Sequence, residues 1–247
     1  MFLFFTAGLF IGSFINTYAY RVLRNKPVAA DRSRCPRCQR PLAPRDLIPI
    51  LSFILLKGKC RYCGGKVSLR YPAAELFTGI VFLFIYLKVG FERELVPYLF
   101  MCCVLIAAAF TDLESMIIHD SLILFALMGG ILLNFLFGTA GLKEMLLGSV
   151  AGGLPLLAVA LMSKGGMGGG DIKLASVMGI FLGWKLVLAA LFISFFIGGM
   201  VGMLLLLLGI KRRKDCIPFG PFLALGGILS ILFGRELIHF YTANFYV

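Results

Sequence analysis

The sequence from Leu186 to Ile210 is LVLAALFISFFIGGMVGMLLLLLGI, a run of 25 residues without one charged side chain. As an α-helix, at about 1.5 Å per residue, this run would be about 37 Å long, and the hydrocarbon core of a bilayer is about 30 Å thick. A surface helix of a soluble domain carries a polar face, and this run has none. It therefore predicts a helix that spans a membrane.

The rest of the chain has the same character. Of its 247 residues, 60% are hydrophobic and 15% are charged, and the chain contains 24 Phe and 29 Gly. This composition excludes a soluble globular domain, a disordered chain, collagen and a small secreted disulfide scaffold. Apolar helices with many small residues are typical of membrane bundles, because small residues let neighbouring helices approach closely. The composition predicts an integral membrane protein in a lipid bilayer.

Seven other apolar segments are separated from this run, and from one another, by charges, Gly or Pro. They are Met1–Tyr20, Ala73–Leu87, Val96–Thr111, Ser121–Phe137, Met145–Met162, Leu174–Gly183 and Ile217–Phe233. We therefore predict an all-α polytopic membrane protein with about eight transmembrane helices. Leu174–Gly183 is short, since ten helical residues reach only about 15 Å. It must be tilted, re-entrant or extended backwards through the glycines that precede it.

Three regions are predicted along the chain. Residues 1–20 form a first transmembrane helix, which has no basic segment before it and is expected to be retained rather than removed as a signal. Residues 21–72 form a polar loop, in which the apolar piece Ile48–Leu56 is too short to span a membrane. Residues 73–247 form a multi-helix membrane domain.

The basic residues indicate the topology. The net charge is +12, and 13 of the 24 Lys and Arg lie between Arg21 and Tyr71. With eight alternating helices, one face carries 19 of the 24. The positive-inside rule then places the polar loop in the cytoplasm and both termini outside, whereas seven helices would move the C-terminus to the cytoplasm. The charge is thus explained by membrane topology, and no nucleic-acid partner is expected.

Two C-x-x-C pairs lie in this loop. Cys35 and Cys38 are followed, after 21 residues, by Cys60 and Cys63. This spacing is typical of a tetrahedral four-thiolate zinc site, although four free cysteines in a cytoplasmic loop are the alternative. A closed shell of four thiolates leaves no open position on the metal, so we predict structural Zn²⁺ and a small zinc-binding cytoplasmic loop.

Two aspartates interrupt apolar segments. Asp112 ends one apolar segment and Asp171 begins another, after Gly168-Gly169-Gly170, and both are predicted at the cytoplasmic boundary. Ionisable groups there are costly and suggest a functional site. Two adjacent carboxylates can share one proton and act as an aspartyl protease pair. A helix-terminal role for Asp171 and simple solvation of Asp112 are the alternatives, and from the residues alone both readings stand.

The other charged residues in these segments have simpler explanations. Lys173 is available to pair with Asp171 or to extend toward the membrane surface. Asp120 is a turn residue that could cap the next helix. Glu75 lies in the first turn of a predicted helix, where the helix dipole favours a carboxylate. The histidines, His119 and His239, have no partner at a spacing that suggests a catalytic site.

Taken in order, these segments resemble the type IV prepilin peptidases of bacterial pilus and type II secretion systems. The matching stretches are Gly12-Ser13-Phe14-Ile15-Asn16, the two C-x-x-C pairs, Arg70-Tyr71-Pro72-Ala73-Ala74-Glu75-Leu76, Thr111-Asp112, Gly168-Gly169-Gly170-Asp171-Ile172-Lys173 and Ile217-Pro218-Phe219-Gly220-Pro221-Phe222-Leu223-Ala224. They cover nearly the whole chain.

The resemblance implies a bifunctional enzyme of the bacterial inner membrane. Family members cut prepilin and pseudopilin precursors, which enter from the membrane, after a Gly on the cytoplasmic side. They then N-methylate the new N-terminus with S-adenosylmethionine. The resemblance identifies Asp112 and Asp171 as the catalytic pair, and the complete set of four cysteines is similar to that of the long bacterial members.

The resemblance also leaves specific points open. The residues that bind the methyl donor are unknown, and Glu75 and the Gly12–Asn16 segment are candidates. His119 stands where family members commonly have Pro, and this change is expected to loosen the turn and to add a titratable group.

Two other functions fit the same residues. Asp112 and Asp171 could line a proton or cation path in a small transporter, although transport carboxylates usually lie near the bilayer midplane on broken helices. The chain could also be a silent scaffold, or keep one of the two activities. The positions of the two aspartates favour the peptidase.

Overall fold

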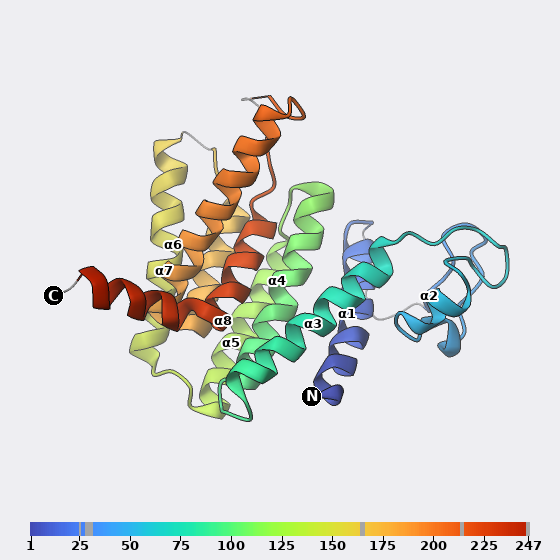
Figure 1. Ribbon diagram of the computed structural model, residues 1–247, viewed down its shortest axis with the longest axis horizontal. Helices are drawn as coiled ribbons and strands as arrows, with labels where there is room; N and C mark the ends of the chain where they lie inside the picture. The colour runs from blue at the N-terminus through green and yellow to red at the C-terminus, as the bar shows by residue number, and fades with distance from the viewer. Residues whose placement is uncertain (25, 28–31, 164–165, 213–214, 246–247) are drawn as a thin grey trace. The chain divides into compact units, whose positions relative to one another are not determined.

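The computed structural model describes residues 1–24, 26–27, 32–163, 166–212 and 215–245 (Figure 1). The chain divides into two compact units, Met1–Leu87 and Lys88–Val247. Within the described residues the regular elements are helices, apart from two isolated β-bridges in the first unit, Arg34–Pro41 and Lys59–Lys66.

Seven of the helices are long and apolar enough to cross a membrane within the part of the chain that the structure describes. The first unit contains α1 (Phe2–Val22), a short 3₁₀ helix (Pro44–Leu47), α2 (Leu51–Leu55) and most of α3 (Arg70–Val89). The second contains α4 (Leu95–Ser115), α5 (Asp120–Phe137), α6 (Leu142–Met162), α7 (Gly169–Leu207) and α8 (Gly220–Phe245). The chain is a multi-pass membrane protein, as predicted, and α2 is the piece expected to be too short to span.

In the first unit, α1 and α3 approach closely through glycines. A Cβ added to Gly8 would lie 2.8 Å from the Cα of Gly79, and one added to Gly12 would lie 2.8 Å from the Cα of Glu75. Gly8 and Gly12 are spaced as in the G-x-x-x-G pattern of membrane helix pairs. Asn16 follows on the same helix and donates a hydrogen bond to the carbonyl of Tyr71, at 3.3 Å. This packing fixes the beginning of α3 against α1.

The helix α7 is bent back on itself. Gly183 interrupts it with a φ of 70° and a ψ of 172°. A Cβ added to Gly152 of α6 would lie 2.1 Å from the Ala175 carbonyl oxygen and 3.1 Å from Val187 Cγ2. In a straight helix these two residues would be about 18 Å apart. The two arms of α7 therefore lie side by side as a helical hairpin (Figure 1).

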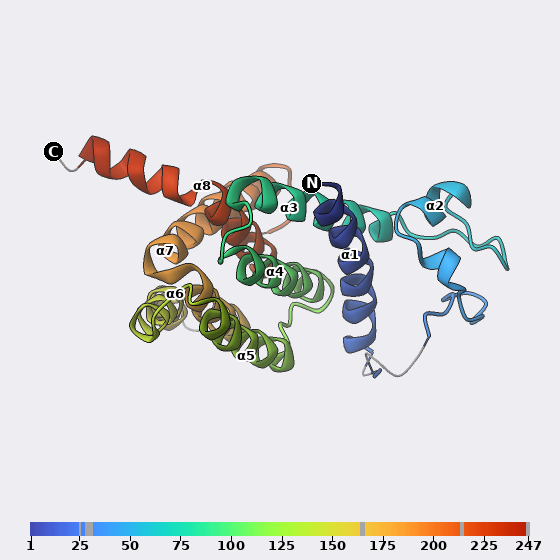
Figure 2. The ribbon, with the colours of Figure 1, turned by 90° about the horizontal axis from the view of Figure 1, so that it is seen from below.

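The hairpin accounts for the short segment in the sequence. Its first arm begins at Gly169, so the apolar segment Leu174–Gly183 is extended backwards through the glycines, which was one of the three possibilities. Counting both arms, the described residues contain eight apolar helical segments, in agreement with the predicted number. Figure 2 looks along the helices of the second unit, where α4, α5, α6 and α7 form a bundle.

A buried asparagine supports the bend. Asn134 of α5 is 2% exposed and donates to the carbonyl of Ile180, at 3.2 Å. In a continuous helix this carbonyl would accept the N–H of Trp184, which lies beyond the break at Gly183. The amide of Asn134 therefore satisfies a backbone group that a membrane helix could not leave unpaired.

We predict that Asn134→Leu lowers the free energy of unfolding by about 1–2 kcal/mol, because the Ile180 carbonyl then loses its partner. Asn244→Leu is the matched control, since Asn244 is exposed and donates only to the Phe240 carbonyl of its own helix, at 2.8 Å. Denaturant unfolding in detergent measures both variants. Equal stability of the two would contradict this role for Asn134.

Candidate functional site

Asp112 lies in the last turn of α4. Its side chain is buried, with the residue 5% exposed, and its Oδ2 accepts a hydrogen bond from the backbone N–H of Gly220, at 2.8 Å. Gly220 is the first residue of α8, and the first N–H groups of a helix have no partner within that helix. The beginning of α8 thus supplies a donor to a carboxylate on α4.

Asp171 lies in the first turn of α7. The residue is 8% exposed, and its Oδ1 is buried without a hydrogen-bond partner among the described residues. Its other oxygen is close to Gly168, where an added Cβ would lie 2.9 Å from Oδ2. The N-cap of α7 is Gly168, and Asp171 is the third residue of the helix. The glycine before the helix leaves room for the carboxylate.

The two aspartates lie at the same end of the second unit. The end of α4 and the start of α8 meet at the Asp112 contact, and the charges of Asp112 and Asp171 are close enough to interact. Neither is paired with a basic side chain in the interactions that the structure records. Two buried carboxylates that interact electrostatically are costly to ionise together, so the pair is suited to hold one proton between them.

Lys173 pairs with Asp120 instead of Asp171. Its Nζ lies 2.7 Å from Oδ1 of Asp120, at the start of α5. Both side chains are exposed, so this ion pair is worth little by itself, but it joins the starts of α5 and α7 at the same end of the unit. Pairing with Asp171 was one of the two readings of Lys173, and the ion pair that the structure records is with Asp120 instead.

His119 occupies the N-cap position of α5, so Asp120 is the first helical residue and does not cap the helix. The φ of His119 is −71°, a value that Pro would also adopt. The backbone therefore has the conformation that Pro would give it, and a looser turn stays a prediction. The Nδ1 atom of His119 is buried without a partner among the described residues.

Gly220 is a residue of this site that the sequence analysis did not single out. A Cβ at this position would lie 2.7 Å from Oδ2 of Asp112. Only Gly allows the backbone of α8 to approach the carboxylate so closely. A signal was present in the Pro-Phe-Gly-Pro stretch at 218–221, because Pro is common at helix starts, but the sequence did not indicate what the helix start would meet.

The four loop cysteines come together in the first unit. The Sγ atoms of Cys35, Cys38, Cys60 and Cys63 all lie within 4.8 Å of one another, and those of Cys35 and Cys63 are 3.9 Å apart. Four sulfurs around a tetrahedral zinc ion, at about 2.3 Å each, are about 3.8 Å apart. The cluster can therefore hold one metal ion with little movement.

The two cysteine turns share one backbone design. In the first, Cys35 N–H donates to the Arg40 carbonyl at 3.0 Å, and Gln39 has a positive φ of 57°. In the second, Cys60 N–H donates to the Gly65 carbonyl at 2.8 Å, and Gly64 has a φ of 66°. Each turn therefore presents its two sulfurs in the same way.

The chemistry of the sulfurs also fits a metal. The Gly65 N–H favours the thiolate of Cys63, but desolvation and the other three sulfurs outweigh it and raise the pKa of Cys63 to about 11. Sulfurs crowded in this way resist carrying several negative charges unless a cation neutralises them. The donor set of four cysteines is that of structural zinc sites.

Glu75 lies in the second turn of α3, one turn further along than expected. The residue is 8% exposed, and its Oε2 accepts the N–H of Ile50, at 2.8 Å. It belongs to the first unit and contacts the segment that leads into α2. A purely helix-terminal role does not explain a carboxylate that is bonded across to another segment.

Comparisons with known proteins cover most of the chain. Residues 6–89 match a family model described as the bacterial peptidase A24 N-terminal domain, and residues 99–203 match the model of the type IV leader peptidase family. No solved structure matches significantly.

Several curated relatives are named prepilin leader peptidase/N-methyltransferase. One from Bacillus subtilis is 40% identical over 243 residues, covering 96% of this chain and 96% of the relative. One from Aeromonas hydrophila is 36% identical over 219 residues, covering 87% and 76%, respectively. One from Pseudomonas aeruginosa is 30% identical over 262 residues, covering 95% and 90%. The similarity includes both units of the chain.

Proposed function

This chain belongs to the type IV leader peptidase family, and we propose its function on that basis. It is a membrane protease that cleaves prepilins and an N-methyltransferase, as its relatives are named. In finer detail, we propose that it cuts prepilin and pseudopilin precursors after a Gly on the cytoplasmic side, and that Asp112 and Asp171 are the catalytic pair.

The proposed cleavage uses one proton shared by the two carboxylates. The ionised one removes a proton from a water molecule, whose oxygen attacks the peptide carbonyl, while the protonated one donates to the carbonyl oxygen. The tetrahedral intermediate then collapses, the C–N bond breaks, and the leaving amine takes a proton from the pair. No covalent bond to the enzyme forms, and one water molecule is consumed.

The observation that carries this proposal is the joint placement of Asp112 and Asp171. Both are buried, both lie at helix ends, and their charges interact at one end of the unit. A substrate helix that enters from the bilayer would present the bond beside its apolar segment at that depth. The charge distribution of the loops supports a cytoplasmic position for this end and for the cysteine loop.

The second activity needs a methyl donor, which we propose to be S-adenosylmethionine. This molecule supplies a methyl group on a sulfonium. As the amine nitrogen of the new N-terminus forms a bond to the methyl carbon, the C–S bond breaks, the electron pair stays on sulfur, and the nitrogen releases a proton to solvent. We further propose that Cys35, Cys38, Cys60 and Cys63 hold structural Zn²⁺, which has no part in either reaction.

Product masses test the proposed function. The purified protein is incubated in detergent with a prepilin-like peptide that contains its leader and apolar segment, with and without S-adenosylmethionine. We expect a cut after Gly in both samples, and a gain of one methyl group only when the donor is present. Cleavage without methylation would rule out the methyltransferase activity. An uncut peptide in the presence of folded protein would overturn the proposal.

A further inference from the structure

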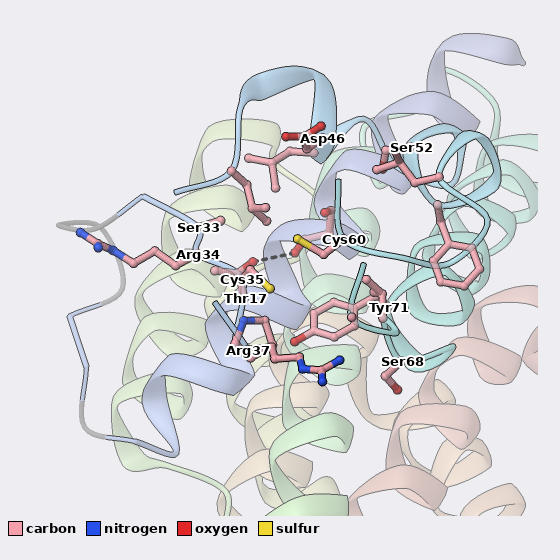
Figure 3. Close-up of a pocket in the computed structure, with 18 of the residues that line it drawn as sticks. Thr17, Ser33, Arg34, Cys35, Arg37, Asp46, Ser52, Cys60, Ser68 and Tyr71 are labelled. Carbon is pink, nitrogen blue, oxygen red and sulfur yellow. Dashed lines mark hydrogen bonds between the residues drawn. The ribbon is translucent and has the colours of Figure 1, made fainter. Parts of the chain in front are cut away.

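The short helix α2 has two faces of different character. Ser52 and Phe53 line a cavity of about 470 Å³, which is formed with the end of α1, the cysteine loop and the start of α3 (Figure 3). The opposite face carries Leu51, Ile54 and Leu55, which are 50%, 63% and 70% exposed. These three residues are spaced i, i+3 and i+4, so they share one side of the helix. The outer face of α2 is thus an exposed apolar surface.

This surface continues into the chain that precedes the helix, where two more large apolar side chains are exposed. Single exposed apolar residues need no explanation, but a larger exposed patch marks a contact with another protein or with a membrane. The five exposed residues, here named the α2 patch, are Leu47, Ile48, Leu51, Ile54 and Leu55.

A hydrogen bond to a membrane-crossing helix places the α2 patch near the bilayer. The N–H of Ile50, the residue before α2, donates to Oε2 of Glu75 at 2.8 Å. All 20 residues of α3 are needed to cross a hydrocarbon core of about 30 Å, so its first residue, Arg70, lies at one membrane boundary. Glu75 is five residues further along, or about 8 Å. The beginning of α2 is therefore held at the depth of the membrane boundary.

The backbone of α2 is suited to an apolar environment. Lipid offers no hydrogen bonds, so N–H groups that enter it need partners within the protein. Gly58, with a φ of 68°, reverses the chain after α2, and its N–H donates to the Phe53 carbonyl at 2.8 Å. Other N–H groups of the segment that donate to its own carbonyls, at 3.0–3.1 Å, are those of Ser52, Ile54, Leu56 and Lys57. The segment can enter the headgroup region without leaving these groups unpaired.

The charges around the α2 patch suit an anionic surface. Between residues 45 and 70, six side chains are basic and one, Asp46, is acidic. Asp46 is paired with Arg61, whose Nε lies 2.7 Å from Oδ1. Arg45 precedes the patch, Lys57 and Lys59 follow it, and all three are exposed. Long basic side chains such as these can reach lipid phosphates while their apolar neighbours are buried below.

We propose that the α2 patch inserts into the headgroup region of the membrane, and that the exposed cations beside it bind anionic phospholipid. Short apolar segments of this kind lie in the membrane plane, with their side chains about 5–10 Å below the surface. The bond to Glu75 favours lipid over a soluble protein partner, because such a partner would have to displace lipid to reach this depth. Neither proposed activity is needed for this contact.

The contact also holds the cysteine loop at the membrane surface. The second cysteine turn begins at Cys60, two residues after Gly58. Val67, which follows that turn, donates its N–H to the Gly58 carbonyl at 2.8 Å. The end of α2 and this turn are therefore joined at both ends of the turn. An α2 anchored in lipid keeps the cysteine turn beside the membrane.

Tryptophan fluorescence in brominated lipid tests the insertion. Trp184 is the only Trp of the chain, so Trp184→Phe removes the native signal. In that background Leu55→Trp places a probe in the α2 patch, and the full-length protein is reconstituted in vesicles of dioleoylphosphatidylcholine or of its dibrominated form. Bromine on the acyl chains quenches only rings that lie close to it. We expect brominated lipid to lower the emission of this probe by about twofold or more, since a ring about 5–10 Å deep meets the acyl chains.

Tyr62→Trp in the same background is the matched control. Tyr62 is exposed on the second cysteine turn, between Arg61 and Cys63, and the proposal leaves this position in water. Its probe should be quenched far less than the one at position 55. Protein that keeps Trp184 gives the response of a ring within a membrane-crossing helix. Equal unfolding temperatures show that the probe variants are folded.

A second comparison tests the role of charge. Brominated phosphatidylglycerol replaces brominated phosphatidylcholine at the same mole fraction in otherwise identical vesicles. Anionic lipid gathered by the cations should make it the stronger quencher of the Leu55→Trp probe, and Lys57→Gln/Lys59→Gln should reduce the difference. Equal quenching by the two lipids, with both lysines present, would overturn the binding of anionic phospholipid.

The remaining outcomes decide the insertion itself. Strong quenching at position 55 with weak quenching at position 62 would support it. An unquenched probe at position 55 would overturn it: blue-shifted emission would then assign the α2 patch to a protein contact, and red-shifted emission would assign it to water. Equal quenching of both probes would place the whole loop in lipid and would overturn an insertion confined to α2. Cleavage and methylation are measured separately, so the proposed function stands or falls independently.

Discussion

Asp112→Asn and Asp171→Asn are each expected to reduce cleavage of a prepilin-like peptide by about 10³-fold or more, while the protein still folds. General acid–base groups contribute about 10²–10⁴-fold to a reaction, and here one carboxylate must accept a proton while the other donates one. Asn has nearly the shape of Asp, and its oxygen can still accept the Gly220 N–H, which lies 2.8 Å from Asp112 Oδ2. The loss would therefore come from proton transfer and not from packing. Rates of product formation, measured by mass spectrometry, give the result.

Asp215→Asn is the matched control for this experiment. Asp215 is an exposed carboxylate between α7 and α8, and it accepts the backbone N–H of Arg212, at 2.8 Å. Its replacement should change the rate by about twofold at most. The double variant Asp112→Asn/Asp171→Asn should be little slower than either single variant, because residues that act as one unit are not additive. Wild-type rates in either single variant would rule out the pair.

The same geometry weakens the transporter hypothesis. Transporter carboxylates usually lie on broken helices near the bilayer midplane. The chain does contain a broken helix, but the break at Gly183 is 12 residues, or about 18 Å, from Asp171. Asp112 and Asp171 lie at helix ends instead, where a peptide bond next to an apolar segment could reach them.

The helical architecture could be predicted because lipid permits few alternatives. A run such as Leu186–Ile210 has to be helical in a bilayer, and the apolar runs alone led to the predicted number of crossing segments. The reversal of α7 could not be predicted, because it depends on a single backbone conformation at Gly183 and on Asn134 of another helix. The sequence contains many other glycines that continue their helices.

The candidate site was predictable in its residue types and less so in its contacts. Asp112, Asp171 and the four cysteines stand out because carboxylates and paired thiols are scarce in apolar sequence. The Gly220 contact to Asp112 and the pairing of Lys173 with Asp120 each join residues that are more than 50 positions apart. Spacing along one helix carries no information about such contacts. The role of the aspartates as a catalytic pair is still a prediction.

The described part of the cysteine loop buries little apolar surface. Of the Leu, Ile, Val, Phe and Tyr side chains in residues 32–68, none is buried, whereas Cys35 and Cys60 are. The loop is braced otherwise by short turns and by hydrogen bonds to Asp46. A structural zinc site can contribute about 10–16 kcal/mol to the folding of such a segment. If the four cysteines hold Zn²⁺ as proposed, the metal is expected to decide whether the loop is ordered.

The double substitution Cys60→Ser/Cys63→Ser is accordingly expected to lower the metal content from about one ion per chain to near zero, because two of the four ligands are lost. The loop should then become sensitive to trypsin at its many Lys and Arg. Cys216→Ser is the control, since Cys216 is exposed and lies outside the cluster, and it should keep both the metal and the protease resistance. Metal analysis by mass spectrometry and a trypsin time course measure the two effects. A metal-free wild type with four alkylatable loop thiols and an intact, resistant loop would contradict this account, because hydrogen bonds and turns alone would then hold the four sulfurs together.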